Sequence, residues 1–498
     1  MCRCLKSIVV SGVAVVAGVL MGGCLNPECP NEPLTTSFDP MAGYRFDSLD
    51  PGDDNSDSVF VCISFSGGGT RAAAFSYGVL LGLCDAQIGT TSEGPVKRLL
   101  DEVDVISSVS GGSFTAMGYA LWHDRLFDGN FERRFLKHNV QLDLILNVLN
   151  PRFLLRLPSV VLDRIDIAGS YYSEGIFYNK AARRPYTYGD LLSANRRPFV
   201  VINATDMTRR QRFEFTQDDF DLLGSDLASM PVGWAVAASS AFPLLFSPLR
   251  LAYFPSDAMV AAIESALHGA EARRDWRRER WARSLLVPDE DADASGLEID
   301  GENHRYLYLL DGGLADNLGV THFIDSYRRG AIRRKLEQDK IDKLVVIIVN
   351  AETDRPVDLE RNPTAPGLFR VGERTGTTAI FNYSDALTRI IKYALLETPE
   401  RVRAVHDGCR ETLEERCPEA APPALPPEFD VEAYVIDVDF LHIEDTKKRK
   451  SFLSMITSFF LPSQDVDDLI DAGRDVLVNH PEFLRLVDDL DGRVLEPG

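Results

Sequence analysis

The sequence predicts an α/β fold of three layers (α/β/α) with a mainly parallel central sheet, helical insertions and a C-terminal extension. The main observation is that short apolar runs alternate with helical patterns. The run "VFVCISF" precedes the helical stretch "RAAAFSYGVLLGLC", and residues Val103 to Val109 precede a turn and a second helix. Later apolar runs are "RPFVVINAT", "RYLYLLDGG" and "KLVVIIVN". A chain of 498 residues, 45% of them hydrophobic, can bury a large core around such a sheet.

The N-terminus has the pattern of an export signal. Arg3 and Lys6 precede an uncharged apolar stretch, and the stretch ends in "LMGGC" at Cys24. This ending resembles a bacterial lipoprotein cleavage box. It predicts a signal peptide over residues 1–23 and a lipid on Cys24, with a plain secretory signal or an uncleaved anchor as the alternative. We therefore expect an exported protein, lipid-anchored to the bacterial cell envelope at the outer membrane.

Charge and cysteine content narrow the function further. The chain has 75 acidic against 53 basic residues and a net charge of −22, which argues against a nucleic-acid partner. Cys409 and Cys417 lie eight residues apart in a polar segment and are the best candidates for a local disulfide. Cys62 and Cys84 lie in apolar patterns and are interpreted as buried small hydrophobes. No set of Cys and His has zinc-site spacing, so no metal or other cofactor is expected.

Beyond the signal, the chain divides into three parts. Residues 24–58 are rich in Pro, Asp, Asn and Ser, which predicts a flexible tether. Residues 59–350 hold the apolar runs and form the expected main domain. Residues 351–498, which include the strand pattern "EAYVIDVDF" and an amphipathic helix after Ser463, complete or flank the core.

Two insertions are expected in the domain, near residues 141–162 and 256–302. The first, "QLDLILNVLNPRFLLRLPSVVL", is interpreted as buried helices, with membrane contact as the alternative. The second contains "AEARRDWRRERWAR", interpreted as a solvated helix. A membrane-surface role for its arginines and tryptophans is the alternative.

The stretch "SVSGG" places Ser110 at a turn between a strand and a helix, with small residues two positions before and after it. A nucleophile elbow needs this arrangement, because the turn is sharp and the hydroxyl must project into the site. Ser108 is expected within the strand and Ser113 within the first turn of the helix. Ser110 is therefore the candidate nucleophile.

Three glycines, Gly67, Gly68 and Gly69, follow the first strand. Without Cβ atoms their amides can converge on one point, which suits a phosphate or an oxyanion. The Gly-Lys-Ser/Thr of a nucleotide-binding loop is missing from "GGGTRA", so an oxyanion hole is favoured over nucleotide binding. A tight packing turn is the structural alternative. Arg71 then either binds a substrate phosphate or supports the loop.

Asp311 ends an apolar strand and is followed by Gly312 and Gly313. Ligands of open α/β sheets bind at the carboxyl edge of the strands. The carboxylate could act alone as the base for Ser110, or could orient a histidine that does. Asp316 and Asn317 are interpreted as turn and capping residues.

Taken together, "SGGGTR", "SVSGG" and "DGG", in this order and each after a strand, resemble the three signature motifs of the patatin-like phospholipase family. "INATD" at 202–206 and "AVAASSAFPLLFSP" at 235–248 also resemble stretches that recur there. The resemblance covers about residues 59–350. It implies a patatin-like fold and a Ser110/Asp311 dyad without histidine, and an oxyanion hole at Gly67, Gly68 and Gly69.

The family's chemistry would make this chain a lipid acyl hydrolase, of the phospholipase A or lysophospholipase type. Its partners would be a lipid substrate and the membrane surface. Ala72 and Ser108 replace glycines that are usual in the family's motifs, and both are small.

Two other functions remain open at this point. The first is an α/β hydrolase with a Ser-Asp-His triad, completed by His322, His406, His442 or His480. The second is an envelope lipoprotein that binds lipid without turning it over, since a sequence does not show that Ser110 and Asp311 meet in space.

Overall fold

A computed structural model describes residues 29–495, with gaps at 57, 90–95, 150–163, 244, 269–274, 287–298, 302, 339, 354–367 and 422–423; the side chains of 148, 149 and 368–376 are not described either. The expected signal peptide and Cys24 therefore lie outside the described residues, and so does most of the first insertion. Among the helices that the structure describes, none combines the length and the apolarity needed to cross a bilayer.

The centre of the molecule is an eight-stranded mixed sheet with the strand order β11-β12-β8-β5-β2-β13-β14, in which β9 pairs with β8. The strands β8, β5, β2, β13 and β14 run parallel, whereas β9, β11 and β12 are antiparallel to their neighbours. Every residue of β2, β5 and β8 is buried, as expected for strands covered on both faces. The α/β fold with a mainly parallel sheet is confirmed. The bounds are β2 Val59–Phe65, β5 Val103–Val109, β8 Phe199–Asp206, β9 Gln211–Glu214, β11 Leu249–Ala252, β12 Tyr306–Asp311, β13 Lys343–Asn350 and β14 Glu432–Asp439.

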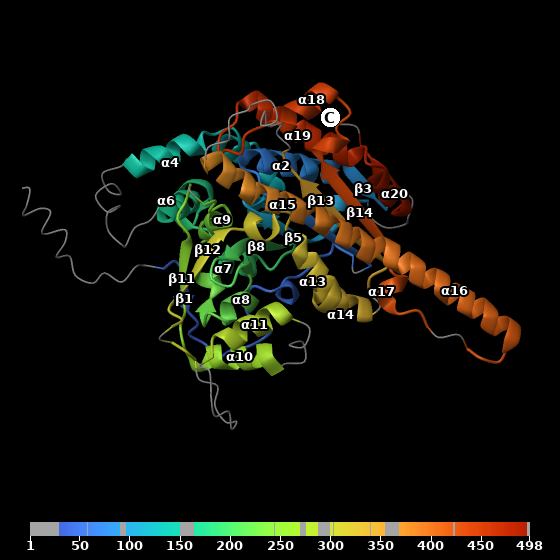
Figure 1. Cartoon of the computed structure of the whole chain (residues 1–498). Helices are drawn as coiled ribbons and strands as arrows, with labels where there is room; N and C mark the ends of the chain where they lie inside the picture. The colour runs from blue at the N-terminus through green and yellow to red at the C-terminus, as the bar shows by residue number, and fades with distance from the viewer. Residues whose placement is uncertain are drawn as a thin grey trace, which may run out of the picture.

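Helices cover both faces of this sheet (Figure 1). On one face lie α2 (Gly69–Asp85), α3 (Gly111–Trp122) and α19 (Ser463–Val478), and on the other lie α13 (Thr321–Arg329) and α14 (Ala331–Glu337). Successive side chains of β2 point to opposite faces of the sheet, so the strand contacts both helical layers. Phe65 lies against Gly112 of α3, whereas Phe60 packs on Phe46 and under Lys335 of α14. These are the three layers that the sequence predicts.

The C-terminal region is part of this core. Strand β14 adds to the edge of the sheet beside β13, and α19 packs closely on α2, where a methyl group on Gly78 would overlap the carbonyl oxygen of Ile470. The apolar face predicted after Ser463 is buried as expected. The remaining C-terminal helices are α15 (Leu368–Lys392), α16 (Thr398–Arg416), α17 (Pro427–Asp430), α18 (Thr446–Leu453) and α20 (Pro481–Asp489).

The predicted disulfide between Cys409 and Cys417 does not form. Both thiols are free and exposed on α16 and at its C-terminal end, on an arm that projects from the body of the molecule (Figure 1). Eight residues of α-helix span about 12 Å, which is too far for a disulfide. The buried position predicted for Cys62 is confirmed, and Cys84 is partly buried.

Residues 29–58 are not the free tether that their composition predicts. Strand β1 (Glu32–Pro33) pairs with β10 (Ser225–Asp226), and Tyr44, Phe46 and Leu49 are buried. Arg45, between Tyr44 and Phe46 in the chain, forms ion pairs with two aspartates of the domain. A few aromatic anchors thus hold a segment that has no helical or strand periodicity.

The described parts of the two insertions are half-buried helices. In α11 (Trp276–Ser284), Arg277 is buried against Asp219 at 2.7 Å and Trp281 is buried, so this helix is not simply solvated. In α4 (Val140–Leu149), Val140 and Leu144 are buried, whereas the apolar side chains on the other side of the helix are exposed. Helices α6 (Arg164–Tyr171) and α10 (Asp257–His268) complete these regions.

Shorter elements connect the layers. They are the small sheet of β15 (Arg493–Val494), β3 (Ala86–Ile88) and β4 (Lys97–Arg98), the pair β6 (Tyr178–Asn179) and β7 (Arg184–Pro185), and the helices α7 (Tyr188–Ala194), α8 (Gln217–Asp221), α9 (Val232–Ser239) and α12 (Gly313–Asp316).

Candidate active site

Ser110 lies at the turn between β5 and α3, where the sequence predicts it. Its backbone has φ 48° and ψ −117°, in the left-handed region that costs about 1–3 kcal/mol for a residue with a side chain. Ser108 lies within β5 and Ser113 within the first turn of α3, and both are fully buried. Ser110 is 8% exposed. Of the three serines, it alone has the strained turn of a nucleophile elbow.

Asp311 ends β12, and one strand, β8, lies between β12 and β5, the strand that precedes Ser110. Val109 pairs with Asn203 of β8, and Asp311 pairs with the next residue of β8, Ala204. The strand β12 is antiparallel to β8, so Asp311 enters the carboxyl edge of the parallel strands from outside. Asp311 therefore lies at the edge of the sheet that the sequence predicts, although β12 runs opposite to the parallel strands.

The carboxyl group of Asp311 lies within reach of the Ser110 side chain and accepts a hydrogen bond from the amide of Gly313 at 2.8 Å. Burial raises the pKa of Asp311 to about 7, and the Gly313 amide and the Ser110 side chain keep it from rising further. The structure thus brings together the serine and the carboxylate that the sequence could only propose as a pair. A carboxyl group with this pKa changes its protonation state near neutral pH.

Two side chains that sequence reasoning left without a role hold this pair in place. The Ser239 hydroxyl, at the end of α9, accepts a hydrogen bond from the Ser110 amide at 2.8 Å and donates one to the Asn203 carbonyl at 2.6 Å. The Asn203 side chain donates to the Ser108 carbonyl at 3.0 Å. The carbonyl of Ser239 accepts from the Gly312 amide, next to Asp311. Both residues lie in the stretches "INATD" and "AVAASSAFPLLFSP", whose resemblance to the family was the one available signal.

We expect Ser239→Ala to lower kcat and stability while leaving KM nearly unchanged. It leaves the buried amide of Ser110 without its acceptor, at a cost of about 1–3 kcal/mol, and loosens the elbow. Ester hydrolysis and thermal unfolding would measure both effects. Ser193→Ala is the control, because that hydroxyl is exposed and bonds only within its own helix, to the Gly189 carbonyl at 2.6 Å. Equal behaviour of the two variants would contradict a positioning role for Ser239.

The glycine loop lies against the elbow. A Cβ on Gly67 would come within 3.4 Å of the Ser110 Cβ, and one on Gly111 would overlap the backbone of Gly69. The Gly67 amide already donates to the Asn317 carbonyl at 3.0 Å, which leaves Gly68 and Gly69 as amides that bond no described group. Gly68 is the N-cap of α2 and Gly69 is its first residue, and Ser110 is the N-cap of α3, so two positive helix ends face this region. The arrangement favours negative charge beside Ser110.

A substitution tests how tightly this loop is held. Gly69 has φ +62°, and a methyl group there would overlap the carbonyl of Ser458. We expect Gly69→Ala to lower kcat about 10²-fold or more and to lower the melting temperature. The matched control is Gly408→Ala on α16, where a Cβ would meet nothing within 4 Å; it should be neutral or stabilising by up to about 1 kcal/mol. An active Gly69→Ala variant would argue against an oxyanion role for the loop.

Arg71 is buried beneath the loop. Its guanidinium donates to the carbonyls of Ala351 at 2.9 Å and Met455 at 3.3 Å, and to the Thr457 hydroxyl at 3.3 Å. These contacts tie the glycine loop to the C-terminal region. They match the loop-supporting role, and contact with a substrate phosphate stays a prediction.

Histidines lie elsewhere. The described groups that act on the Asp311 carboxyl are Ser110 and Gly313, and no histidine is among them. His322 pairs with Glu214 at 2.8 Å, and Asp316 caps the turn before it through the amides of Leu318, Gly319 and Thr321, as the sequence predicts. The geometry therefore gives no support to a Ser-Asp-His triad.

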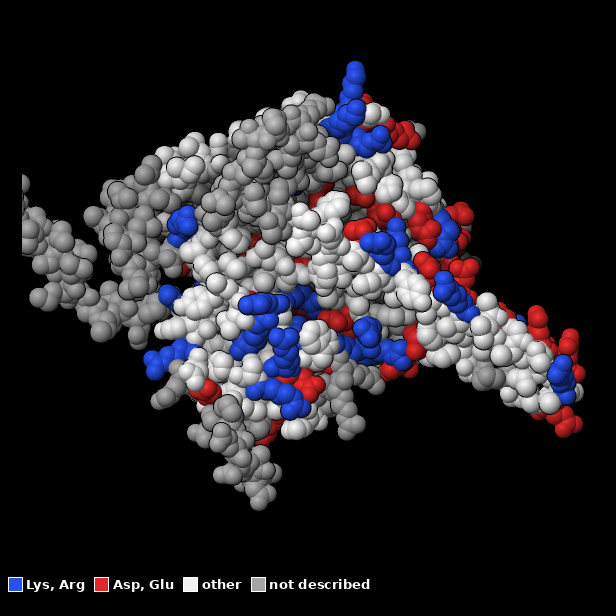
Figure 2. Space-filling model, viewed as in Figure 1, with Lys and Arg blue, Asp and Glu red and all other residues white. Residues whose placement is uncertain are grey.

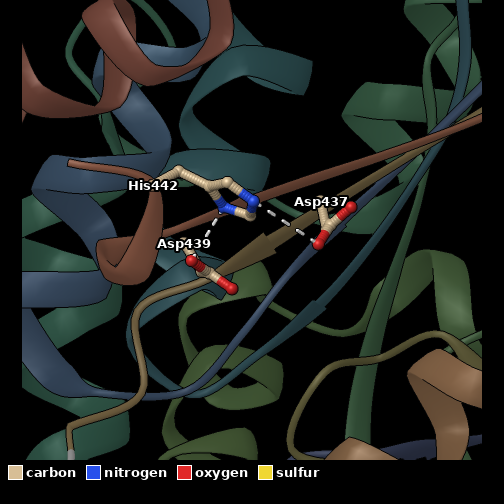
Figure 3. A group of neighbouring side chains, drawn as sticks. All are labelled: Asp437, Asp439 and His442. Atoms are coloured by element: carbon tan, nitrogen blue, oxygen red, sulfur yellow. Dashed lines mark ion pairs between the residues drawn. The ribbon is translucent and has the colours of Figure 1, made fainter. Parts of the chain in front are cut away.

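A second group of potential ligands lies at the end of the edge strand β14. Figure 3 shows the His442 ring between Asp437 and Asp439, with Nδ1 2.9 Å from an Asp439 oxygen and Nε2 3.9 Å from an Asp437 oxygen. Lys392 donates to Asp437 at 2.8 Å. Burial alone would raise the pKa of Asp437, but the hydrogen bond and charge of Lys392, together with His442 and His480, outweigh it and lower that pKa. With one imidazole directed at both carboxylates and an ammonium on one of them, the group is explained as an ion-pair cluster.

Fold and site together define an α/β protein in which a serine on a strained strand-to-helix turn lies beside a buried aspartate and a glycine loop. A family model described as patatin-like phospholipase matches residues 63–324, which is more than half of the chain. The chain belongs to the patatin-like phospholipase family.

Similar structures and sequences add the following. Human GIVD cytosolic phospholipase A2 matches with a TM-score of 0.43 and 13% identity, over 87% of this chain and 60% of that one. The same protein in complex with methyl gamma-linolenyl fluorophosphonate matches with a TM-score of 0.40 and 13% identity, over 87% and 59%. This chain thus spans less than two thirds of the length of that protein. No curated protein matches the sequence.

Proposed function

We propose that this chain is a lipid acyl hydrolase, of the phospholipase A or lysophospholipase type, with Ser110 as nucleophile and Asp311 as base. The observation that carries the proposal is that Ser110, on its strained turn, lies beside a buried Asp311 whose pKa is about 7. A base with such a pKa is about half ionised at neutral pH and can still hold a proton in the transition state. Membership of the patatin-like phospholipase family supports lipid as the substrate class.

The proposed mechanism is acyl transfer in two halves. Asp311 takes the proton from the Ser110 hydroxyl as its oxygen attacks the ester carbonyl, and the amides of Gly68 and Gly69 bind the resulting oxyanion. The intermediate collapses, and the alcohol leaves with the proton that Asp311 held. Water then attacks the acyl-enzyme with Asp311 again as base, which releases the fatty acid and restores Ser110.

A reactive phosphonate tests this assignment directly. We expect a long-chain fluorophosphonate to add once to the wild-type chain, with loss of fluoride, and peptide mass spectrometry to find the adduct on Ser110. Ser113→Ala is the matched control and should react normally, because Ser113 lies inside α3. An unreactive folded wild type would favour the lipid-binding alternative. Loss of reaction on replacing His322 would favour the triad.

A further inference from the structure

Two stretches beside the site contain no charged residue, although 26% of the chain is charged. One lies between Asp226 and Arg250, and the other between Lys450 and Asp465. Each contacts the candidate site: the Ala241 carbonyl accepts from the Asp311 amide at 3.0 Å, and the Ser458 carbonyl accepts from the Thr70 amide at 2.9 Å. Neutral segments thus border the site on two sides.

These stretches and α4 form one surface. The rings of Phe246 and Phe459 lie 6.5 Å apart, and the Gln141 amide, in α4, donates to the Phe459 carbonyl at 3.3 Å. Large apolar side chains on this surface are exposed, with Ile456 at 65%. We call them the apolar rim: Leu142, Ile145, Leu146, Leu245, Ile456 and Phe460. Contiguous exposed apolar patches mark interaction sites.

A basic helix adjoins the rim in the chain. Helix α18 carries Lys447, Lys448, Arg449 and Lys450, and its last turn runs into the second neutral stretch. No described carboxylate forms an ion pair with its three lysines, and Asp445 caps the amides of Lys447 and Lys448 instead. Basic side chains gather at the place of α18, at the top of Figure 2, in a molecule whose net charge is −22.

We propose that the apolar rim and the lysines of α18 dock this protein onto a bilayer that contains anionic phospholipid. Apolar side chains next to lysines are the pattern of interfacial binding, in which the former enter the headgroup region and the latter contact lipid phosphates. The inference rests on the proposed function, because docking here would bring the lipid surface toward Ser110. The charge of α18 selects anionic lipid over a neutral surface.

Hydrogen exchange of the full chain gives a local test. The N-terminal apolar segment of the full chain could bind vesicles by itself, so the readout must come from the rim. We expect vesicles of phosphatidylcholine and phosphatidylglycerol in equal amounts to slow exchange at residues 141–147 and 454–460, and pure phosphatidylcholine to do so much less. Exchange in α16 should not change. No protection at the rim on either vesicle would overturn the proposal.

Charge-matched variants test the role of α18. Replacing Lys447, Lys448 and Lys450 by Gln should weaken the protection by anionic vesicles at least about tenfold in lipid concentration. It should leave hydrolysis of a short p-nitrophenyl ester unchanged. The control replaces three arginines of the α16 arm by Gln, with the same loss of charge, and should keep the protection: Arg401, Arg410 and Arg416. Equal protection in both triple variants would overturn the proposal.

A further variant separates docking from catalysis. Ser110→Ala should keep full protection at the rim while hydrolysing nothing. If the wild type is inactive but protected, the proposed function fails and the docking surface stands. If the wild type hydrolyses the soluble ester without protection on vesicles, the docking surface fails and the proposed function stands.

Discussion

Ser110→Ala is expected to lower kcat for ester hydrolysis by about 10⁴-fold or more, because it removes the nucleophile of both half-reactions. Residual rate above the uncatalysed reaction would come from the glycine amides and substrate binding alone. The measurement is release of p-nitrophenol from a short ester and of fatty acid from phospholipid vesicles.

The variant should remain folded, because Ser110 contributes little to packing and its strained backbone does not depend on the hydroxyl. Its amide would still donate to Ser239. Ser113→Ala is the matched control. Ser113 lies three residues after Ser110, inside α3, and this variant should stay active. A fully active Ser110→Ala variant would remove Ser110 from the mechanism.

Much of this site could be predicted from local sequence. The strand and helix around Ser110 follow from apolar runs and small residues, and the structure places β5 over Val103–Val109 and α3 from Gly111 as predicted. The candidate nucleophile depends on its immediate neighbours in the chain. Local pattern is sufficient for such a residue.

What local pattern could not supply was the pairing of distant segments. Ser239 reaches Ser110 from 129 residues away, and Thr457 reaches Arg71 from 386 residues away. The antiparallel entry of β12 is likewise a property of the sheet and not of "YLYLLDGG". The packing of Tyr44 and Phe46 in a segment without periodicity was missed for the same reason: their partners lie far along the chain.

The second large effect concerns Asp311 and pH. We expect kcat/KM on a neutral ester to rise with pH along a limb with an apparent pKa of about 7, because only the carboxylate of Asp311 can accept the proton of Ser110. An ordinary aspartate would give a limb near pH 4. Asp311→Asn should abolish the limb and lower kcat by about 10⁴-fold.

A histidine base would give a similar limb, so temperature is needed to separate them. The enthalpy of ionisation is large for an imidazole and close to zero for a carboxylic acid, so only the pKa of the imidazole changes strongly with temperature. The midpoint should therefore stay in place between cold and warm buffer if Asp311 is the base. His322→Gln should leave the limb unchanged, since that ring pairs with Glu214. A midpoint that moves strongly with temperature would favour the triad.

The same pKa predicts an opposite effect on stability. Because burial raises the folded pKa of Asp311 above its unfolded value, the folded state is favoured while the group is protonated, and this advantage is lost as pH rises from about 4 to about 7. At pH 8 the ionised carboxylate lowers the free energy of unfolding by up to about 4 kcal/mol. Asp311→Asn removes that charge and keeps an oxygen for the Gly313 amide. The inactive variant should therefore melt at a higher temperature than the wild type at pH 8, and the difference should close as pH falls to 4; a variant that melts lower at pH 8 would show that Asp311 is not held as a strained base.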